Sequence, residues 1–401
     1  MRALEYRLDA ARWLAARHLG GRWSSLAVGF SGVRLRDRPV PAPPAAGWVR
    51  LRVRQTGICG TDVATLRGRT GPQLSPFVSF PAVLGHEVLA VVEEGELAGR
   101  RVVLDPFLGC AARGLPLCPA CSAGHGALCH RFAQGDLAPG MLTGYCRDVS
   151  GGWAEAMVAH PGQMHPVPDG LDDDSAVLAE PLAVALHGVL AARPATGDRV
   201  LIIGAGTIGL CVLAALRLLE TPAEVVAVAR HPWQADRARA LGAPHVVPDV
   251  AAAERLAADA GWGSAHAGLW GTQGWTGGFD HVFDAVGSAA SMAAALRLAQ
   301  AGGQVQLLGC SGVLPRLDLT PVWAHELDVR GFCGYGSEPQ AQGMHTIAYG
   351  MRLLAGRPDV RLGELVTHRF PLEGYREALS AAFFHRASHA LKVVFTPAPE
   401  S

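Results

Sequence analysis

The sequence predicts a two-domain α/β protein in which a β-rich domain accompanies a doubly wound parallel sheet. Length is the first reason, because the chain has 401 residues and a single hydrophobic core usually stops growing at about 250–300 residues. A change of pattern near residue 195 is the second reason. Short strands and loops dominate before it, and strands alternate with helices after it, as in a parallel sheet.

The expected elements follow from runs of apolar residues. In the β-rich part, a Pro-rich turn at 39–44 precedes a strand at 48–53. After residue 195 the pattern predicts strands at 199–203, 224–229, 279–284 and 304–308, with helices at 208–219, 234–241 and 288–298. A closing strand is expected at 392–395.

Composition excludes several classes of partner. Lys+Arg and Asp+Glu number 35 each, so no bulk charge attracts the chain to nucleic acid or to an anionic membrane. Residues 1–20 lack the apolar core of a secretory signal. The apolar run at 200–219 contains three glycines and Arg217, and it opens as a strand rather than as a membrane span. We therefore expect a soluble, cytoplasmic protein with no nucleic-acid or membrane partner.

A glycine-rich turn predicts a dinucleotide site. Gly204, Gly206 and Gly209 form Gly-x-Gly-x-x-Gly directly after a predicted strand, with Thr207 and Ile208 opening the following helix. The first glycine permits the tight turn, the second lets the backbone approach a pyrophosphate, and the third lets the helix pack on the strand. The free N–H groups at the helix N-terminus suit the phosphates.

The end of the next strand indicates which dinucleotide is bound. An NAD site needs a carboxylate there for the ribose hydroxyls. Here the place is filled by Ala229, and Arg230 follows. Because a guanidinium suits a 2′-phosphate, we expect NADP(H) rather than NAD(H).

Three short motifs precede the glycine turn and carry a family resemblance. They are Gly57-Ile-Cys-Gly-Thr-Asp62, Gly85-His-Glu87 and Glu180-Pro-Leu-Ala183. Together and in this order, they resemble the zinc-containing medium-chain dehydrogenases, nearest in motif to polyol, sorbitol and threonine dehydrogenases. The resemblance covers nearly the whole chain. It implies a GroES-like, zinc-binding catalytic domain over 1–186 and 337–401 and a Rossmann domain over 187–336.

The resemblance also implies a catalytic zinc site. Carried over by motif, Cys59, His86 and Glu180 would be zinc ligands, Glu87 would alternate on and off the metal, and Asp62 would support the imidazole. The hydroxyl of Thr61 would hand on the substrate proton. Lys392 matches a basic residue that the family places near the cofactor pyrophosphate.

One position departs from the family pattern. The family's relay histidine, five residues after the ligand cysteine, is replaced by Ala64. Solvent, the ribose hydroxyls or another group would then complete the relay, or the proton would come from elsewhere.

Four of the nine cysteines suggest a second, structural zinc ion. Without a secretion signal, clustered cysteines are expected to bind metal rather than to form disulfides. Cys118, Cys121 and Cys129 fit the last three positions of the family's structural lobe, but Leu115 stands at the first, so Cys110 is the natural substitute. The alternatives are a three-cysteine site completed by His125 or His130, or a lobe without metal.

These features predict a zinc-dependent oxidoreductase that transfers a hydride between NADP(H) and an alcohol or carbonyl substrate. A homodimer or homotetramer is implied by the resemblance. One alternative is a reductase of activated C=C or C=N bonds, with or without zinc. A non-catalytic nucleotide-binding protein is the other, and the retained Thr61 disfavours it. An N-terminal extension around 9–25 and a loop at 130–152 exceed the family frame, and the sequence assigns neither a role.

Overall fold

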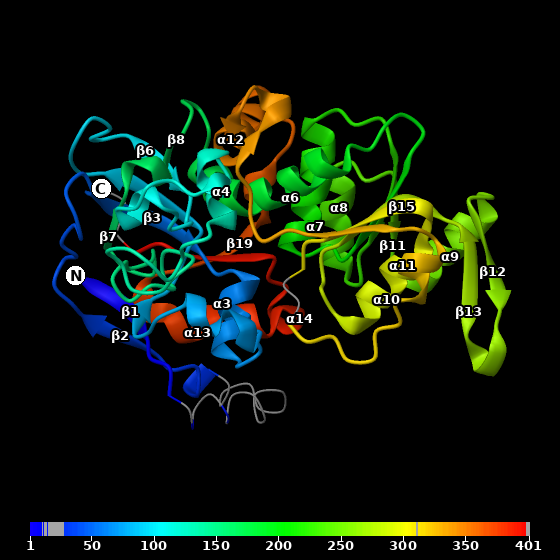
Figure 1. The fold of residues 1–401 in the computed structure, drawn as a ribbon, viewed down its shortest axis with the longest axis horizontal. Coiled ribbons are helices and arrows are strands. Elements are labelled where there is room, and N and C mark those ends of the chain that lie inside the picture. The colour runs from blue at the N-terminus through cyan, green and yellow to red at the C-terminus, as the bar shows by residue number, and fades with distance from the viewer. Residues whose placement is uncertain (10, 12–13, 15–27, 310–311, 398–401) are drawn as a thin grey trace. The chain divides into compact units, whose positions relative to one another are not determined.

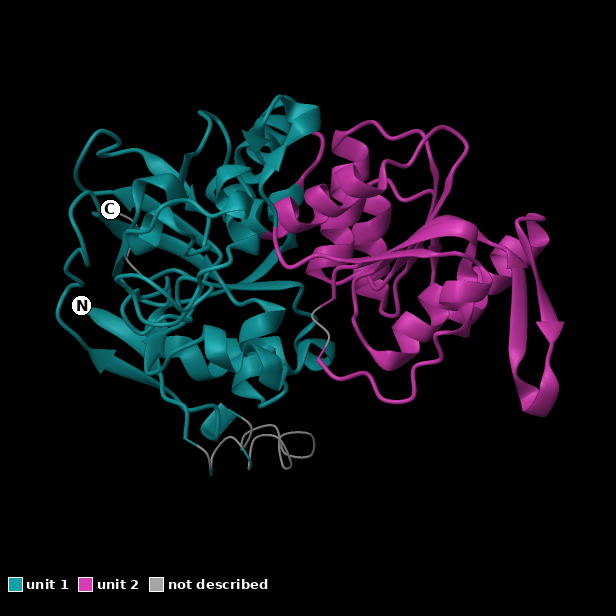
Figure 2. Ribbon diagram, in the orientation of Figure 1, with its two compact units in different colours: residues 1–180, 335–356, 362–401 teal, residues 181–334, 357–361 magenta. Residues whose placement is uncertain are grey.

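The chain forms two compact units (Figure 2). The computed structural model describes residues 1–9, 11, 14, 28–309 and 312–397. The first unit comprises residues 1–180, 335–356 and 362–401, and the second comprises 181–334 and 357–361. The N-terminal extension noted at 9–25 falls mostly outside the described residues.

The second unit is built on a six-stranded sheet in the order β11-β10-β9-β14-β15-β16. Every pairing in this sheet is parallel. Its strands are β9 (Arg199–Ile203), β10 (Glu224–Val228), β11 (His245–Val247), β14 (Phe279–Asp284), β15 (Ala299–Leu307) and β16 (Asp328–Gly331). Its helices are α6 (Ala179–Ala192), which begins at the end of the first unit, α7 (Thr207–Leu218), α8 (Pro232–Ala240), α9 (Val250–Asp259), α10 (Ala289–Leu298) and α11 (Thr320–Ala324).

The predicted parallel, doubly wound sheet is confirmed. β9 and β14 have the expected bounds, and β15 begins five residues earlier than its prediction. α7 packs against β9 and β14, whereas α9 and α10 cover strand residues that include Leu201 and Val282. One addition was not expected: β12 (Gly263–Ala267) and β13 (Gln273–Gly277) form an antiparallel hairpin outside the main sheet (Figure 1).

The first unit is β-rich, as expected. A seven-stranded sheet has the order β19-β20-β3-β5-β6-β8, with β7 also paired to β3, and a smaller sheet has the order β2-β1-β4. The strands are β1 (Arg2–Tyr6), β2 (Val33–Asp37), β3 (Val49–Gly57), β4 (Ala82–Val83), β5 (Val88–Val92), β6 (Arg101–Leu104), β7 (Ala156–Ala159), β8 (Met164–Pro166), β17 (Ser337–Glu338), β18 (Met344–His345), β19 (Val366–Phe370) and β20 (Lys392–Phe395). The helices are α3 (Gly60–Leu66), α4 (Pro119–Ser122), α5 (Asp173–Val177), α12 (Thr346–Gly356), α13 (Tyr375–Phe383) and α14 (His385–Ser388).

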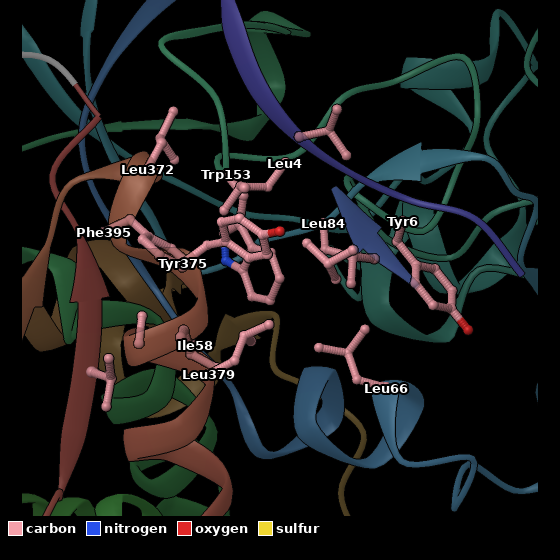
Figure 3. Close-up of a cluster of buried hydrophobic side chains, with 14 of the residues drawn as sticks. Leu4, Tyr6, Ile58, Leu66, Leu84, Trp153, Leu372, Tyr375, Leu379 and Phe395 are labelled. Carbon is pink, nitrogen blue, oxygen red and sulfur yellow. The ribbon is translucent and has the colours of Figure 1, made fainter. Parts of the chain in front are cut away.

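A cluster of buried apolar side chains includes Ile58 and Leu84, which lie close in sequence to the predicted ligands Cys59 and His86 (Figure 3). Trp153 is fully buried at its centre, and its indole N–H donates to the carbonyl of Gly57 at 3.2 Å. Ile58, the neighbour of Cys59, packs in the same cluster. Close-packed interiors tolerate little displacement, so this cluster holds the end of β3 in a defined position.

Among the described residues, no helix combines the length and apolar character that a bilayer crossing requires.

Candidate functional site

Cys59 lies at the junction of β3 and α3, where it caps the helix. Its backbone N–H donates to Oδ2 of Asp62 at 2.9 Å, and its sulfur accepts from the backbone N–H of Thr61 at 3.5 Å. This reciprocal arrangement is a capping box, and it determines where both side chains point. Oγ1 of Thr61 lies 3.6 Å from the Cys59 sulfur, so the predicted proton carrier is adjacent to the predicted ligand.

His86 follows a backbone turn that only glycine accepts easily. Gly85 has a φ of 94°, and a Cβ there would lie 2.3 Å from Cδ1 of Trp153. His86 is buried, with Nδ1 3.5 Å from Oδ1 of Asp62. Burial lowers the pKa of His86, but Asp62 and Cys59 raise it by more, so the net pKa lies well above its usual value. The imidazole therefore sits between the cysteine and the aspartate.

Tyr145 is a contributor that sequence analysis missed. Its hydroxyl donates to Oδ1 of Asp62 at 2.9 Å, and Asp62 is fully buried. The tyrosine lies in the loop at 130–152, so this loop supports the aspartate that faces His86. No local pattern could have revealed the contact, because 83 residues separate its partners.

Glu180 is buried in the first turn of α6. Its Oε1 accepts a hydrogen bond from the hydroxyl of Tyr335 at 3.1 Å, a second partner not predicted from sequence. Burial raises the pKa of the Glu180 carboxyl to about 7, with Glu87 adding to the rise and the charges of His86 and Lys392 opposing it. These electrostatic interactions show that Glu180 shares its surroundings with the other predicted site residues.

Glu87 and Lys392 form a buried ion pair. Nζ of Lys392, on β20, donates to both carboxylate oxygens of Glu87 at 2.7 and 2.6 Å, and both side chains are almost completely enclosed. A buried charge needs such a partner to offset its desolvation. The expected roles of Lys392 at a pyrophosphate and of Glu87 at a metal stay predictions.

The chemistry of the donor set fits a catalytic zinc ion. A thiol, an imidazole and a carboxylate are ligand types that zinc prefers, and three protein ligands leave one position open. Among the described residues, however, Cys59, His86 and Glu180 do not form a set whose ligand atoms all lie within 4.8 Å of one another. His86 and Glu180 are buried and Cys59 is partly buried, and the three side chains lack the close grouping seen in the cysteine lobe.

The four cysteines of the predicted structural site do come together. Sulfur atoms of Cys110, Cys118, Cys121 and Cys129 all lie within 4.8 Å of one another. Backbone N–H groups of His130 and Cys121 lower the pKa of the Cys118 thiol to about 6, which favours the thiolate that binds metal. Burial raises the pKa of Cys129. None of the eight described cysteines forms a disulfide, so the lobe offers four sulfur ligands, as a structural zinc site requires.

The glycine turn of the second unit has the form that a dinucleotide requires. Gly204 has a φ of 98°, which side chains rarely adopt, and a Cβ on Gly209 would lie 1.8 Å from the carbonyl oxygen of Gly204. The protein's own backbone therefore requires glycine at both positions. Gly206, at the N-terminus of α7, has open space where a Cβ would stand. Its absent side chain leaves room for a ligand, consistent with a pyrophosphate. Ala229 is buried and Arg230 exposed just beyond β10.

Comparison with known proteins supports the family resemblance that the sequence motifs indicated. Residues 45–169 match the alcohol dehydrogenase GroES-like domain, and residues 207–348 match the zinc-binding dehydrogenase family. Sorbitol dehydrogenase of Arabidopsis thaliana is 30% identical, over 86% of this chain and 88% of that protein. L-idonate 5-dehydrogenase of Vitis vinifera is 28% identical, over 92% of this chain and 94% of that protein. The structure of a zinc-binding dehydrogenase from Sinorhizobium meliloti 1021, bound to NADP, is 28% identical in sequence and has a TM-score of 0.68. The match covers 91% of this chain and 95% of that chain.

The chain therefore belongs to the zinc-type medium-chain alcohol dehydrogenase family. Membership confirms the predictions of an oxidoreductase, of a GroES-like domain and of a nicotinamide dinucleotide cofactor.

Proposed function

We propose that the protein transfers a hydride between NADP(H) and the hydroxyl-bearing or carbonyl carbon of a small alcohol or ketone. The observation that carries this proposal is the arrangement around Asp62. That carboxylate joins the Cys59 backbone, the His86 ring and the Tyr145 hydroxyl, and it leaves the Thr61 hydroxyl beside the Cys59 sulfur. Such an arrangement orients a thiol and an imidazole together and keeps a proton carrier next to them.

In this proposal Cys59, His86 and Glu180 would hold a catalytic zinc ion. When bound, the ion supplies a Lewis acid that polarises the substrate oxygen. Asp62 orients the His86 ring. A carboxylate in this position also raises the basicity of an imidazole that binds a metal. Glu180, with its pKa near 7, is held by Tyr335.

Thr61 is assigned the proton transfer. Its hydroxyl accepts the proton of the substrate alcohol during oxidation and returns it during reduction. Ala64 carries no titratable group, so the proton leaves Thr61 by a route that does not include this position. The Lys392–Glu87 pair neutralises charge next to the Gly57–Cys59 segment.

NADP(H) is proposed as the cofactor because the end of β10 lacks a carboxylate. Ala229 offers nothing to the ribose hydroxyls, and the exposed Arg230 suits a 2′-phosphate. The S. meliloti structure with NADP shows that a relative of this chain binds that dinucleotide.

Steady-state kinetics of two variants test the proposed reaction. Cys59→Ser should abolish turnover, and Thr61→Ala should lower kcat by about 10²-fold or more, since a positioned proton carrier contributes about 10²–10⁴-fold. A panel of polyols, sugar acids, aldehydes and ketones with NADPH or NADP⁺ supplies the substrate. The matched control is Thr272→Ala, in the hairpin of the second unit. Undiminished turnover in Cys59→Ser and Thr61→Ala would contradict the mechanism.

A further inference from the structure

Residues outside both zinc sites form a third cluster of metal-type ligands in the first unit. Asp105 follows β6, His165 lies on β8 and His345 on β18. One ring nitrogen of each histidine and one carboxylate oxygen all lie within 4.8 Å of one another. Sequence analysis gave no sign of this cluster, because its members lie 60 or more positions apart in the sequence.

The surrounding backbone fixes each member of the cluster. β6 and β8 pair with Val103 opposite His165, and Asp105 lies two residues beyond Val103, so Asp105 and His165 fall on the same face of the ladder. Oδ1 of Asp105 accepts from the backbone N–H of Phe107 at 3.1 Å, and Oδ2 lies 3.4 Å from Nε2 of His345. The two imidazole rings stack with centroids 4.2 Å apart. These ligands are therefore arranged before any ion arrives.

Two nitrogen atoms of the cluster lack a partner. Nε2 of His165 and Nδ1 of His345 are enclosed, and neither has a hydrogen-bond partner in the part of the chain that the structure describes. Leaving a buried polar atom unsatisfied costs free energy, and each such atom calls for an explanation. A bound metal ion would supply a partner for such a nitrogen, since imidazole is the commonest metal ligand in proteins.

We propose that Asp105, His165 and His345 bind a divalent transition-metal ion, with zinc as the first candidate. Two imidazoles and one carboxylate suit zinc and ferrous iron, and they leave positions for water. The side chains of Asp105 and His345 are 13% and 21% exposed, which gives an ion a way in. This proposal does not rest on the hydride transfer proposed above, because none of its three ligands belongs to the predicted catalytic site.

The ion would also act on the predicted catalytic site. The Tyr335 ring packs edge-on against His345, with centroids 5.6 Å apart, and its hydroxyl donates to Glu180. An ion that immobilises His345 would therefore restrict the tyrosine that holds Glu180.

Anomalous diffraction from wild-type crystals tests the proposal directly. Crystals grown with micromolar zinc should show, at the metal absorption edge, a peak about 2.0–2.2 Å from a ring nitrogen of His165 and of His345. A peak in the lobe of Cys118 and Cys121 serves as the internal positive control. A water without anomalous signal between the histidines would overturn the proposal, as would a peak seen only at millimolar zinc.

Metal content in solution gives a second test. His345→Gln and Asp105→Asn should each contain about one equivalent less metal per chain than wild type at the same micromolar free zinc. His266→Gln, an exposed histidine on the hairpin, should match wild type. Wild-type metal content in both folded variants would overturn the proposal. If neither variant folds, the wild-type crystals decide the question.

Discussion

A single buried guanidinium organises the loop region around the cysteine lobe. All five N–H groups of Arg113 donate to backbone carbonyl oxygens, and the residue has no exposed surface. The acceptors are the carbonyls of Leu108, Gln134, Leu137, Ala138 and Gly140. An arginine has five such donors, so every donor of this side chain has a partner. Four of the acceptors lie in the loop at 130–152, and the guanidinium therefore fixes the backbone path of that loop.

Arg113→Lys should therefore be strongly destabilising. A lysine offers three donors and cannot reproduce the planar fork, so at least two carbonyls lose their partners. Since a hydrogen bond to a charged group contributes about 1.5–3 kcal/mol, we expect the free energy of unfolding to fall by about 3 kcal/mol or more in chemical denaturation. Arg131→Lys is the matched control, because Arg131 donates to one carbonyl at the surface. Equal stability of the two variants would contradict this account.

Tyr145→Phe should weaken the catalytic zinc site without unfolding the protein. The change removes the hydroxyl that donates to Asp62, and groups that support a metal ligand typically contribute 10–100-fold in metal affinity. We expect chelator-treated enzyme to need about tenfold more free zinc to regain half its activity. Tyr349→Phe, on α12, is the control. An unchanged zinc requirement would mean that Asp62 does not depend on Tyr145.

Local pattern explains which site residues were predictable. Cys59, Thr61 and Asp62 lie within one capping box, and His86 follows a glycine with a positive φ, so short motifs reveal them. Tyr335 reaches Glu180 across 155 residues of sequence. Such contacts depend on how distant strands and loops are packed, which a single sequence does not encode in any local spacing.

At the scale of elements, the cysteine lobe is a candidate for metal-dependent folding. Cys121→Ser should remove one zinc per chain and lower the unfolding temperature, because structural zinc sites contribute folding free energy. Cys59→Ser should also remove one zinc but leave the unfolding temperature nearly unchanged. Metal analysis combined with calorimetry checks both. Identical unfolding temperatures for Cys121→Ser and wild type would show that the lobe folds without its ion.

Strands and helices alternate regularly in most of the second unit, which made its sheet predictable. The hairpin lies outside this alternation and was not predicted. A buried parallel strand such as β9 reads as a nearly continuous apolar run, and the bounds of β9 and β14 agree with expectation. The hairpin of β12 and β13 has mostly exposed residues and many glycines. It therefore presents neither the apolar run of a buried strand nor a clear two-face alternation.

At the scale of the whole molecule, the chemistry is divided between two units. The predicted zinc ligands and Thr61 all belong to the first unit, whereas the glycine turn and Arg230 belong to the second. Residues predicted to bind metal and residues predicted to select the cofactor therefore lie in separate units, and substitutions at the two sets should have independent effects if they share no partners. Cofactor preference should therefore be changeable without any change in metal content.

Ala229→Asp provides the last test. The new carboxylate should accept ribose hydroxyls and repel a 2′-phosphate, while Arg230→Ala should remove the cation that binds that phosphate. Because a charged hydrogen bond contributes about 1.5–3 kcal/mol, we expect each variant to weaken NADPH binding by about ten- to a hundredfold. Only Ala229→Asp should gain affinity for NADH, as measured by fluorescence titration.

The control for added charge is Ala258→Asp, at an exposed position of α9. Zinc per chain should equal that of wild type in all three variants, because none of these positions belongs to the first unit, which carries the predicted zinc ligands. If both Ala229→Asp and Arg230→Ala kept the wild-type ratio of NADPH to NADH affinity, the end of β10 would not select the cofactor. The preference would then have to arise from residues elsewhere in the second unit.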